Sequence, residues 1–87
     1  EGKYNSFRKY PHLVARLRQH LSPSEARIAL QALVRRDELQ PDSRLALFEN
    51  IAAHFKSIVT FPNDATDGIS DEQYIRNVVD ALYRNSS

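Results

Sequence analysis

Apolar residues recur at intervals of three and four along most of the chain, which is the period of an amphipathic α-helix. The pattern predicts four helices over residues 11–20, 23–38, 41–58 and 71–84. Val78-Val79 is strand-like, but the Asp, Arg and Asn residues around it interrupt any period of two. The predicted fold is therefore all-α, a small bundle of four helices, with an extra turn near the N-terminus.

Capping residues mark where the helices begin. Ser22-Pro23-Ser24-Glu25 has the order of a capping box, with proline at the first helical position. Ser70-Asp71-Glu72-Gln73 repeats the order with Gln in place of Glu, and its two acids suit the positive end of the helix dipole. The short link at residues 39–40 predicts that the second and third helices form an antiparallel hairpin.

The core is expected where the apolar faces of the helices meet. The second helix has the widest apolar stripe, so we expect it to be central and covered on two sides. Phe61 lies in the ten-residue link 60–69 and is expected to pack inward as a plug, with an exposed contact site as the alternative. The predicted centre of the core consists of Leu30, Leu33, Phe48, Ile51, Phe55, Val78 and Leu82.

The length of 87 residues allows one domain. Pro11 disfavours a continuous helix through Phe7, so we expect a separate turn just before it. We divide the chain into an N-terminal extension at 1–10, partly ordered, a single helical domain at 11–84, and a frayed tail at 85–87.

The net charge of +1 conceals an asymmetry along the chain. Residues 1–36 carry eight Lys and Arg against two Asp and Glu, whereas residues 37–87 carry four against nine. Two interpretations follow: the two halves attract each other, or a basic N-terminal face meets an anionic membrane surface or an acidic partner.

Four basic residues are the candidate contacts for an anionic surface. Arg8 and Lys9 precede Pro11, and Arg16 and Arg18 lie off the apolar stripe of the first helix. Arg8 and Lys9 are therefore expected to be mobile, and Arg16 and Arg18 to be exposed. A membrane surface is one predicted partner of these residues, because clustered Lys and Arg side chains are attracted to anionic lipid.

The sequence lacks the residue patterns of an enzyme. It has no cysteine and two glycines, which excludes a thiol nucleophile and a glycine-rich phosphate loop. His12, His20 and His54 have no His or carboxylate at the spacing of a zinc helix, and the aspartates of residues 64–71 lack the order of a calcium loop. We predict no catalytic residues, no metal and no cofactor.

No apolar run approaches the 18 residues of a membrane-spanning helix, and residues 1–3 do not open a signal peptide. The sequence also contains no Met, even at position 1, so we expect it to be part of a longer protein.

The stretch 21–84 resembles the soluble C-terminal tail that follows the transmembrane helices in bacterial RDD-family membrane proteins. The segments that carry the likeness are Leu21-Ser22-Pro23-Ser24-Glu25, Arg35-Arg36-Asp37-Glu38-Leu39, Pro41-Asp42-Ser43-Arg44-Leu45-Ala46-Leu47, Ile51-Ala52-Ala53-His54-Phe55 and Ser70-Asp71-Glu72-Gln73-Tyr74-Ile75. The resemblance implies a cytoplasmic helical appendage, tethered to the membrane through another part of the chain. The residues that give the family its name lie in its membrane part, so no functional residue is carried over.

Together these observations predict a non-catalytic helical interaction or regulatory domain, cytoplasmic and attached to a membrane protein. The alternative is a small nucleic-acid-associated helical module that uses the basic face of the first two helices. A helix-turn-helix arrangement is disfavoured, because its third helix would place Asp42 and Glu49 against phosphates. The pattern specifies no protein partner and no oligomeric state.

Overall fold

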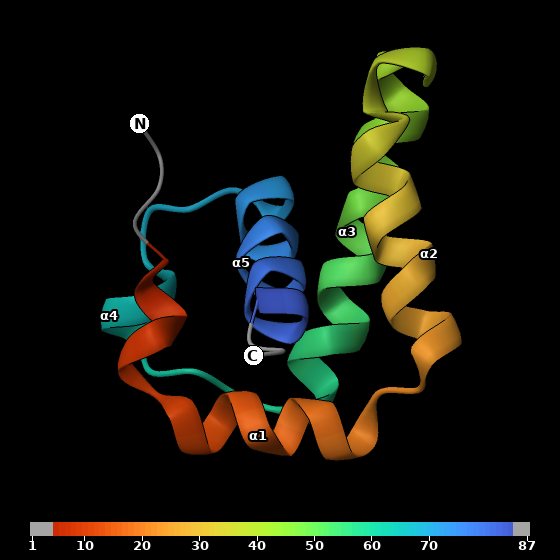
Figure 1. The fold of residues 1–87 in the computed structure, drawn as a ribbon. Coiled ribbons are helices and arrows are strands. Elements are labelled where there is room, and N and C mark those ends of the chain that lie inside the picture. Colours follow the sequence, from red (N-terminus) through yellow and green to blue (C-terminus); the bar gives the residue numbers. More distant parts are fainter. Residues whose placement is uncertain (1–4, 85–87) are drawn as a thin grey trace.

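Seven helical elements follow one another along residues 5–84, the part of the chain that the structure, a computed structural model, describes (Figure 1). No strand occurs in that part, which confirms the predicted all-α bundle with its extra N-terminal turn. The short α4 is an additional turn within the predicted link. In chain order the elements are η1 (Ser6–Lys9), α1 (Pro11–His20), α2 (Pro23–Val34), η2 (Arg36–Glu38), α3 (Pro41–Ile58), α4 (Asn63–Thr66) and α5 (Asp71–Arg84).

Proline defines the beginning of the first three α-helices. Pro11, Pro23 and Pro41 each occupy a first helical position, where a missing N–H breaks no helical hydrogen bond. Before α2 the predicted capping box is complete: Ser22 Oγ accepts from the Glu25 N–H at 3.1 Å, and Glu25 Oε1 accepts from the Ser22 N–H at 2.8 Å. These starts were predictable because every interaction involved is local.

The second helix is shorter than predicted. Arg35 leaves the helical conformation, at φ −100° and ψ 15°, so α2 ends at Val34 and η2 follows as a separate 3₁₀ turn. Leu39 and Gln40 are then extended, and Pro41 starts α3 in the opposite direction. The predicted antiparallel hairpin is present, and its tip extends beyond the rest of the domain at the upper right of Figure 1.

The central helix is α5, and the expectation that the second helix would be central is wrong. Helix α5 contacts η1, α1, α2 and α3, and Figure 1 shows it surrounded by them. Tyr74, Ile75 and Val78 on α5 are at most 2% exposed. By contrast, Ile28 and Val34 on α2 are 56% and 74% exposed, because the wide apolar stripe of α2 is only partly covered.

The buried core confirms part of the predicted centre. Phe48, Phe55 and Val78 are buried as predicted, and Phe61 is the internal plug that the sequence indicated. Four predicted members pack at the edge of the core and are only half-buried: Leu30, Leu33, Ile51 and Leu82. The largest side chains that are fully buried belong to Phe7, Leu17, Phe55, Ile75 and Val78.

Residues 5–10, which the sequence assigned to an N-terminal extension, contribute the most buried aromatic ring. Phe7 is 0% exposed; it stacks on Phe61 with ring centroids 4.0 Å apart and meets the edge of Tyr74 at 5.1 Å. Asn5 Oδ1 accepts from the Phe7 N–H, and Asn5 Nδ2 donates to the Asn77 carbonyl of α5, both at 2.9 Å. The predicted tail at 85–87 lies outside the described residues.

We expect Phe7→Ala to destabilise the whole domain. The substitution removes a ring that α5 and the segment before α4 both contact, and the loss of a buried Phe costs roughly 3–5 kcal/mol of unfolding free energy. Urea denaturation measures this loss, and Phe7→Leu should show a smaller one. Leu45→Ala is the control, since Leu45 is 67% exposed and should change stability by about 0.5 kcal/mol or less. An unchanged midpoint for Phe7→Ala would contradict this packing.

Candidate functional site

The helices of residues 5–84 include none that is long and apolar enough to cross a membrane. The same residues contain no group of three or more His, Asp or Glu side chains placed to hold a metal ion. Two surface features remain as candidates for function. One is a positively charged edge on η1 and α1, and the other is an apolar groove between α2 and α3.

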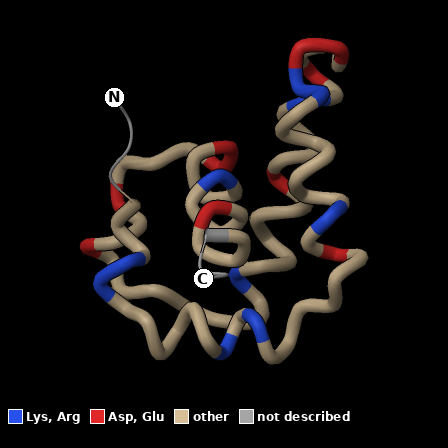
Figure 2. The backbone as a smooth tube through the Cα atoms, in the orientation of Figure 1, with Lys and Arg blue, Asp and Glu red and all other residues tan. Residues whose placement is uncertain are grey.

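The positively charged edge comprises the exposed residues of η1 and α1, which together contain no Asp or Glu. In Figure 2, Lys and Arg follow η1 and α1 along the lower left of the molecule, without any acidic segment on α1. We call this surface the basic edge and define it by Arg8, Lys9, His12, Arg16 and His20, all of which are exposed.

Within residues 5–84, the Lys and Arg side chains of the basic edge have no ion-pair partner. Among the described residues, Arg8, Lys9 and Arg16 form no ion pair with any carboxylate. Two acids bond to residues that flank η1 and form no ion pair with these cations: Asp64 accepts from Tyr10 Oη at 2.7 Å, and Asp80 accepts from Asn5 Nδ2 at 2.9 Å. The three cations are therefore available to an external anion.

Arg18, the fourth candidate, is exposed as predicted, but we leave it out of the basic edge because it also bonds α5. Its Nη2 donates to the Ala81 carbonyl of α5 at 2.7 Å. Ala81 is in the last turn of α5, where carbonyls have no partner inside the helix and carry the negative end of the helix dipole. Arg18 thus positions α1 against α5. The sequence places it beside the other cations, but this partner is 63 residues away and no local pattern indicates it.

The attraction between the two charged halves occurs at the hairpin tip instead. Arg35 pairs with Glu38 at 3.1 Å, and Arg36 Nε lies 2.7 Å from Oε2 of Glu72 on α5. The Glu72 carboxylate raises the pKa of Arg36. Burial by itself would raise the pKa of Glu72, but its contacts with Arg76 and Arg36 lower it below the usual value. The ion pairs between the two halves of the chain therefore involve Arg35 and Arg36, just after the end of α2. They do not involve the Lys and Arg side chains of the basic edge.

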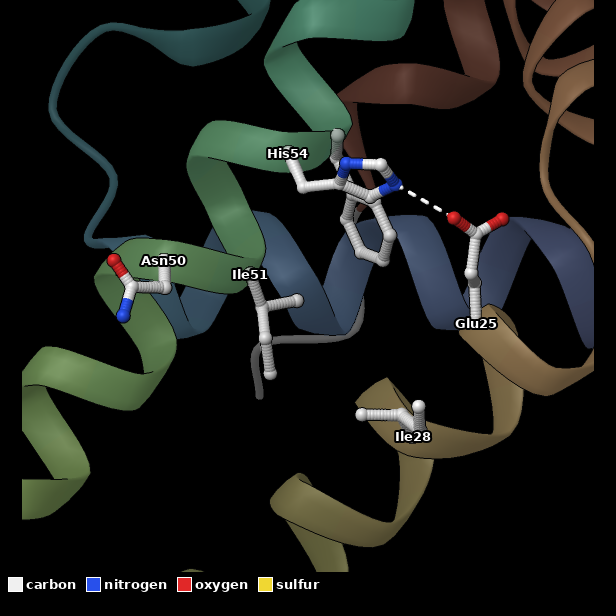
Figure 3. Close-up of a pocket in the computed structure, with 6 residues that line it drawn as sticks. Glu25, Ile28, Asn50, Ile51 and His54 are labelled. Carbon is white, nitrogen blue, oxygen red and sulfur yellow. Dashed lines mark hydrogen bonds and ion pairs between the residues drawn. The ribbon is translucent and has the colours of Figure 1, made fainter.

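The apolar groove has a volume of about 200 Å³ and opens between α2 and α3. Figure 3 shows Ile28 of α2 and Ile51 of α3 directed into it, and Asn50 directed away from Ile28. Phe55 also lines the groove, and the pair Glu25 and His54 bridges the two helices. Ile28 is exposed, so the groove is an apolar feature of the surface.

Glu25 joins the beginning of α2 to α3. One carboxylate oxygen accepts from the Ser22 N–H, and the other lies 2.9 Å from His54 Nε2. The hydrogen bond from Ser22 and the contact with His54 both lower the pKa of Glu25. The nearby Ser57 hydroxyl donates to the His54 carbonyl at 2.6 Å, so its partner is the backbone and not the imidazole.

Comparisons with protein-family models, with curated proteins and with solved structures give no match for this chain. The resemblance to the RDD-family tail therefore stays a prediction.

We expect Arg18→Gln to loosen the C-terminal end of α5. The Ala81 carbonyl loses a charged donor, which should cost roughly 0.5–1.5 kcal/mol. Faster hydrogen exchange in α1 and the last turns of α5 would report the change. Arg16→Gln is the matched control, because Arg16 is on the same helix, is exposed and has no such contact. Equal effects of the two substitutions would contradict the positioning role of Arg18.

The lowered pKa of Glu25 predicts a pH-dependent contribution to stability. Because the folded state favours the carboxylate, this contribution is present above the usual pKa of 4.5 and is lost as the pH falls through the lowered value. Glu25→Gln keeps an acceptor for Ser22 but loses the charge. Urea unfolding should show this variant to be less stable than the native protein at neutral pH, with the difference shrinking in acid. Glu49→Gln, on the exposed side of α3, should show no such trend.

Proposed function

We propose that this chain is a non-catalytic helical interaction domain that lies on the cytoplasmic side of a membrane, as an appendage of a membrane protein. Its basic edge contacts the anionic lipid surface. The observation that carries the proposal is the set Arg8, Lys9 and Arg16: three exposed cations without acidic partners, on two elements that contain no acid. The resemblance to the RDD-family tail agrees with the membrane location.

The strength of the contact fits an appendage better than a free protein. Each basic residue near an anionic leaflet contributes about 1 kcal/mol, so three contribute about 3 kcal/mol, or roughly a 150-fold gain. Such binding is weak and is screened by salt over about 10 Å. A covalent link to a membrane protein would keep the local concentration of lipid high, so that weak contacts suffice to orient the domain.

The geometry allows the three cations to contact one surface together. Arg8 and Lys9 are on η1 and Arg16 is on α1, and Figure 2 shows the basic segment of η1 at the lower left of the molecule and the basic segments of α1 along its bottom. The buried Phe7 and Leu17 fix the two elements to the core from the inside. Little ordering of the backbone is therefore needed for binding.

The nucleic-acid alternative receives less support from the surfaces. Helix α2 adds the exposed Arg27, but Arg35 and Arg36 at its end are already paired with acids. Asp42 and Glu49 are exposed on α3, where a recognition helix would meet phosphates.

Co-sedimentation with vesicles tests the proposal. At low ionic strength the native domain should bind phosphatidylcholine vesicles that contain about one third phosphatidylglycerol, and should not bind pure phosphatidylcholine. Arg16→Glu should weaken binding about fivefold or more, and reversal of Arg8, Lys9 and Arg16 together should abolish it. Arg27→Glu is the matched control, because it makes the same charge change on an exposed helical site outside the basic edge.

Two results would refute the membrane contact. One is the same degree of binding to both vesicle types, or to neither, at low salt. The other is tight, salt-sensitive binding to duplex DNA that disappears with the same triple reversal, which would favour the nucleic-acid alternative.

A further inference from the structure

Three residues of the basic edge form a row along α1. His12, Arg16 and His20 are spaced by four residues, so they lie on one face of the helix, and all three are exposed. The buried Val14 and Leu17 face the core from the other side of α1. The row therefore forms the outward face of the helix, with Arg16 between two imidazoles.

The groups around the row leave the two histidines without acidic partners. The elements that pack most extensively on α1 are η1, α3 and α5. Element η1 offers only the cations Arg8 and Lys9. Among the described residues, no carboxylate forms an ion pair or hydrogen bond with His12 or His20.

The charged side chains on the other neighbouring elements are engaged elsewhere. On α3, His54 faces Glu25, and Lys56 lies 3.7 Å from Asp71 of α5. Glu72 and Arg76 of α5 pair with each other, and Asp80 accepts from Asn5. On α3, Asp42 and Glu49 are exposed and form no ion pair among the described residues, but they lie in the half of the helix toward the hairpin tip. On α4, Asp64 accepts from Tyr10 Oη at the beginning of α1 and keeps its negative charge. No described carboxylate forms an ion pair with the row, so a proton gained by either imidazole would add positive charge to the basic edge.

We propose that the row His12–Arg16–His20 makes binding of the basic edge to anionic lipid dependent on pH, weak at neutral pH and stronger in mild acid. This inference rests on the proposed membrane contact. Imidazole is the side chain that gains a positive charge between about pH 8 and pH 5. Two such charges would raise the cations of the basic edge from three to five.

The size of the effect follows from the contribution of single charges. Each cation near an anionic leaflet strengthens binding about fivefold, so two more give roughly 25-fold. Binding and protonation are also reciprocal: if protonation favours binding, the anionic surface favours protonation. The negative surface potential reinforces this coupling because it concentrates protons near the lipid.

The dimensions of the row favour an extended surface over one small anion. His12 and His20 are eight residues apart, which is about 12 Å along a helix. The three side chains thus address separate headgroups, whereas a single phosphate ion could contact only one or two of them. Helix α1 also lies flat along the edge of the domain, and the chain returns to the core at both ends, through Phe7 and Leu21 (Figure 1). A flat bilayer fits this shape.

The experiment measures vesicle binding at about pH 7.5 and about pH 5.5, at one low ionic strength, with the phosphatidylglycerol vesicles used above, whose headgroups stay anionic over that range. The native domain should bind up to about 25-fold more tightly at the lower pH. His12→Gln/His20→Gln should bind as the native domain does at the higher pH and lose the gain at the lower pH. His54→Gln is the matched control, an exposed histidine on α3 that should leave the gain unchanged.

Each contrary outcome has a distinct meaning. Native binding that is equal at both pH values overturns the role of the row but leaves the membrane contact standing. No binding at either pH overturns both. A pH-dependent gain that survives in the double variant, or disappears in His54→Gln, assigns the effect to other groups and overturns the inference.

Displacement by inorganic phosphate at constant ionic strength would indicate a single-anion site. Preferential binding to duplex DNA would indicate a nucleic-acid surface. Either result overturns the inference. Unfolding curves of all variants at both pH values confirm that each is folded.

Discussion

The covering of α5 on nearly all sides is the constraint on which the rest of the structure depends. Its buried residues include Tyr74, Ile75 and Val78, and even Asn77 is only 4% exposed. A helix with so broad a buried surface needs partners around most of its circumference. The aromatic ring of Phe7, the helix α1 and the α2–α3 hairpin provide them. Burial also raises the pKa of Tyr74 to about 12.

The position of α1 against α5 decides which of its residues face solvent. Val14 and Leu17 are directed at the core, and Arg18 bonds the Ala81 carbonyl in the last turn of α5. With these residues fixed, the helical period leaves His12 and Arg16 on the outside. The basic edge is thus a consequence of how α1 packs, and its residues are held by a rigid support and not by a loop.

The α2–α3 hairpin, unlike α1, leaves part of its apolar surface uncovered. Both of its helices pack on α5 more extensively than on each other, and the groove beside Ile28 and Ile51 remains open between them. Glu25 and His54 bridge this opening at a distance of 2.9 Å. At the tip, Arg35 and Arg36 neutralise acids of the second half of the chain. The two ends of the basic N-terminal segment therefore differ: the Arg residues at the hairpin tip are paired with acids, whereas Arg8, Lys9 and Arg16 form no ion pair among the described residues.

The sequence by itself determined the all-α class, the helix starts at Pro11, Pro23 and Pro41, the capping box at Ser22 and the inward position of Phe61. These features depend on period, proline and capping, which act over a few residues and so can be read locally. The tertiary structure alone decided that α5 is central, that Phe7 belongs to the core, and that Arg18 differs from its basic neighbours. Each of these results requires a partner from the other end of the chain: Asn5 bonds Asn77, 72 residues away, and Arg18 bonds Ala81, 63 residues away. Local patterns carry no information about such partners, because the free energy that selects them comes from the packing of the whole chain.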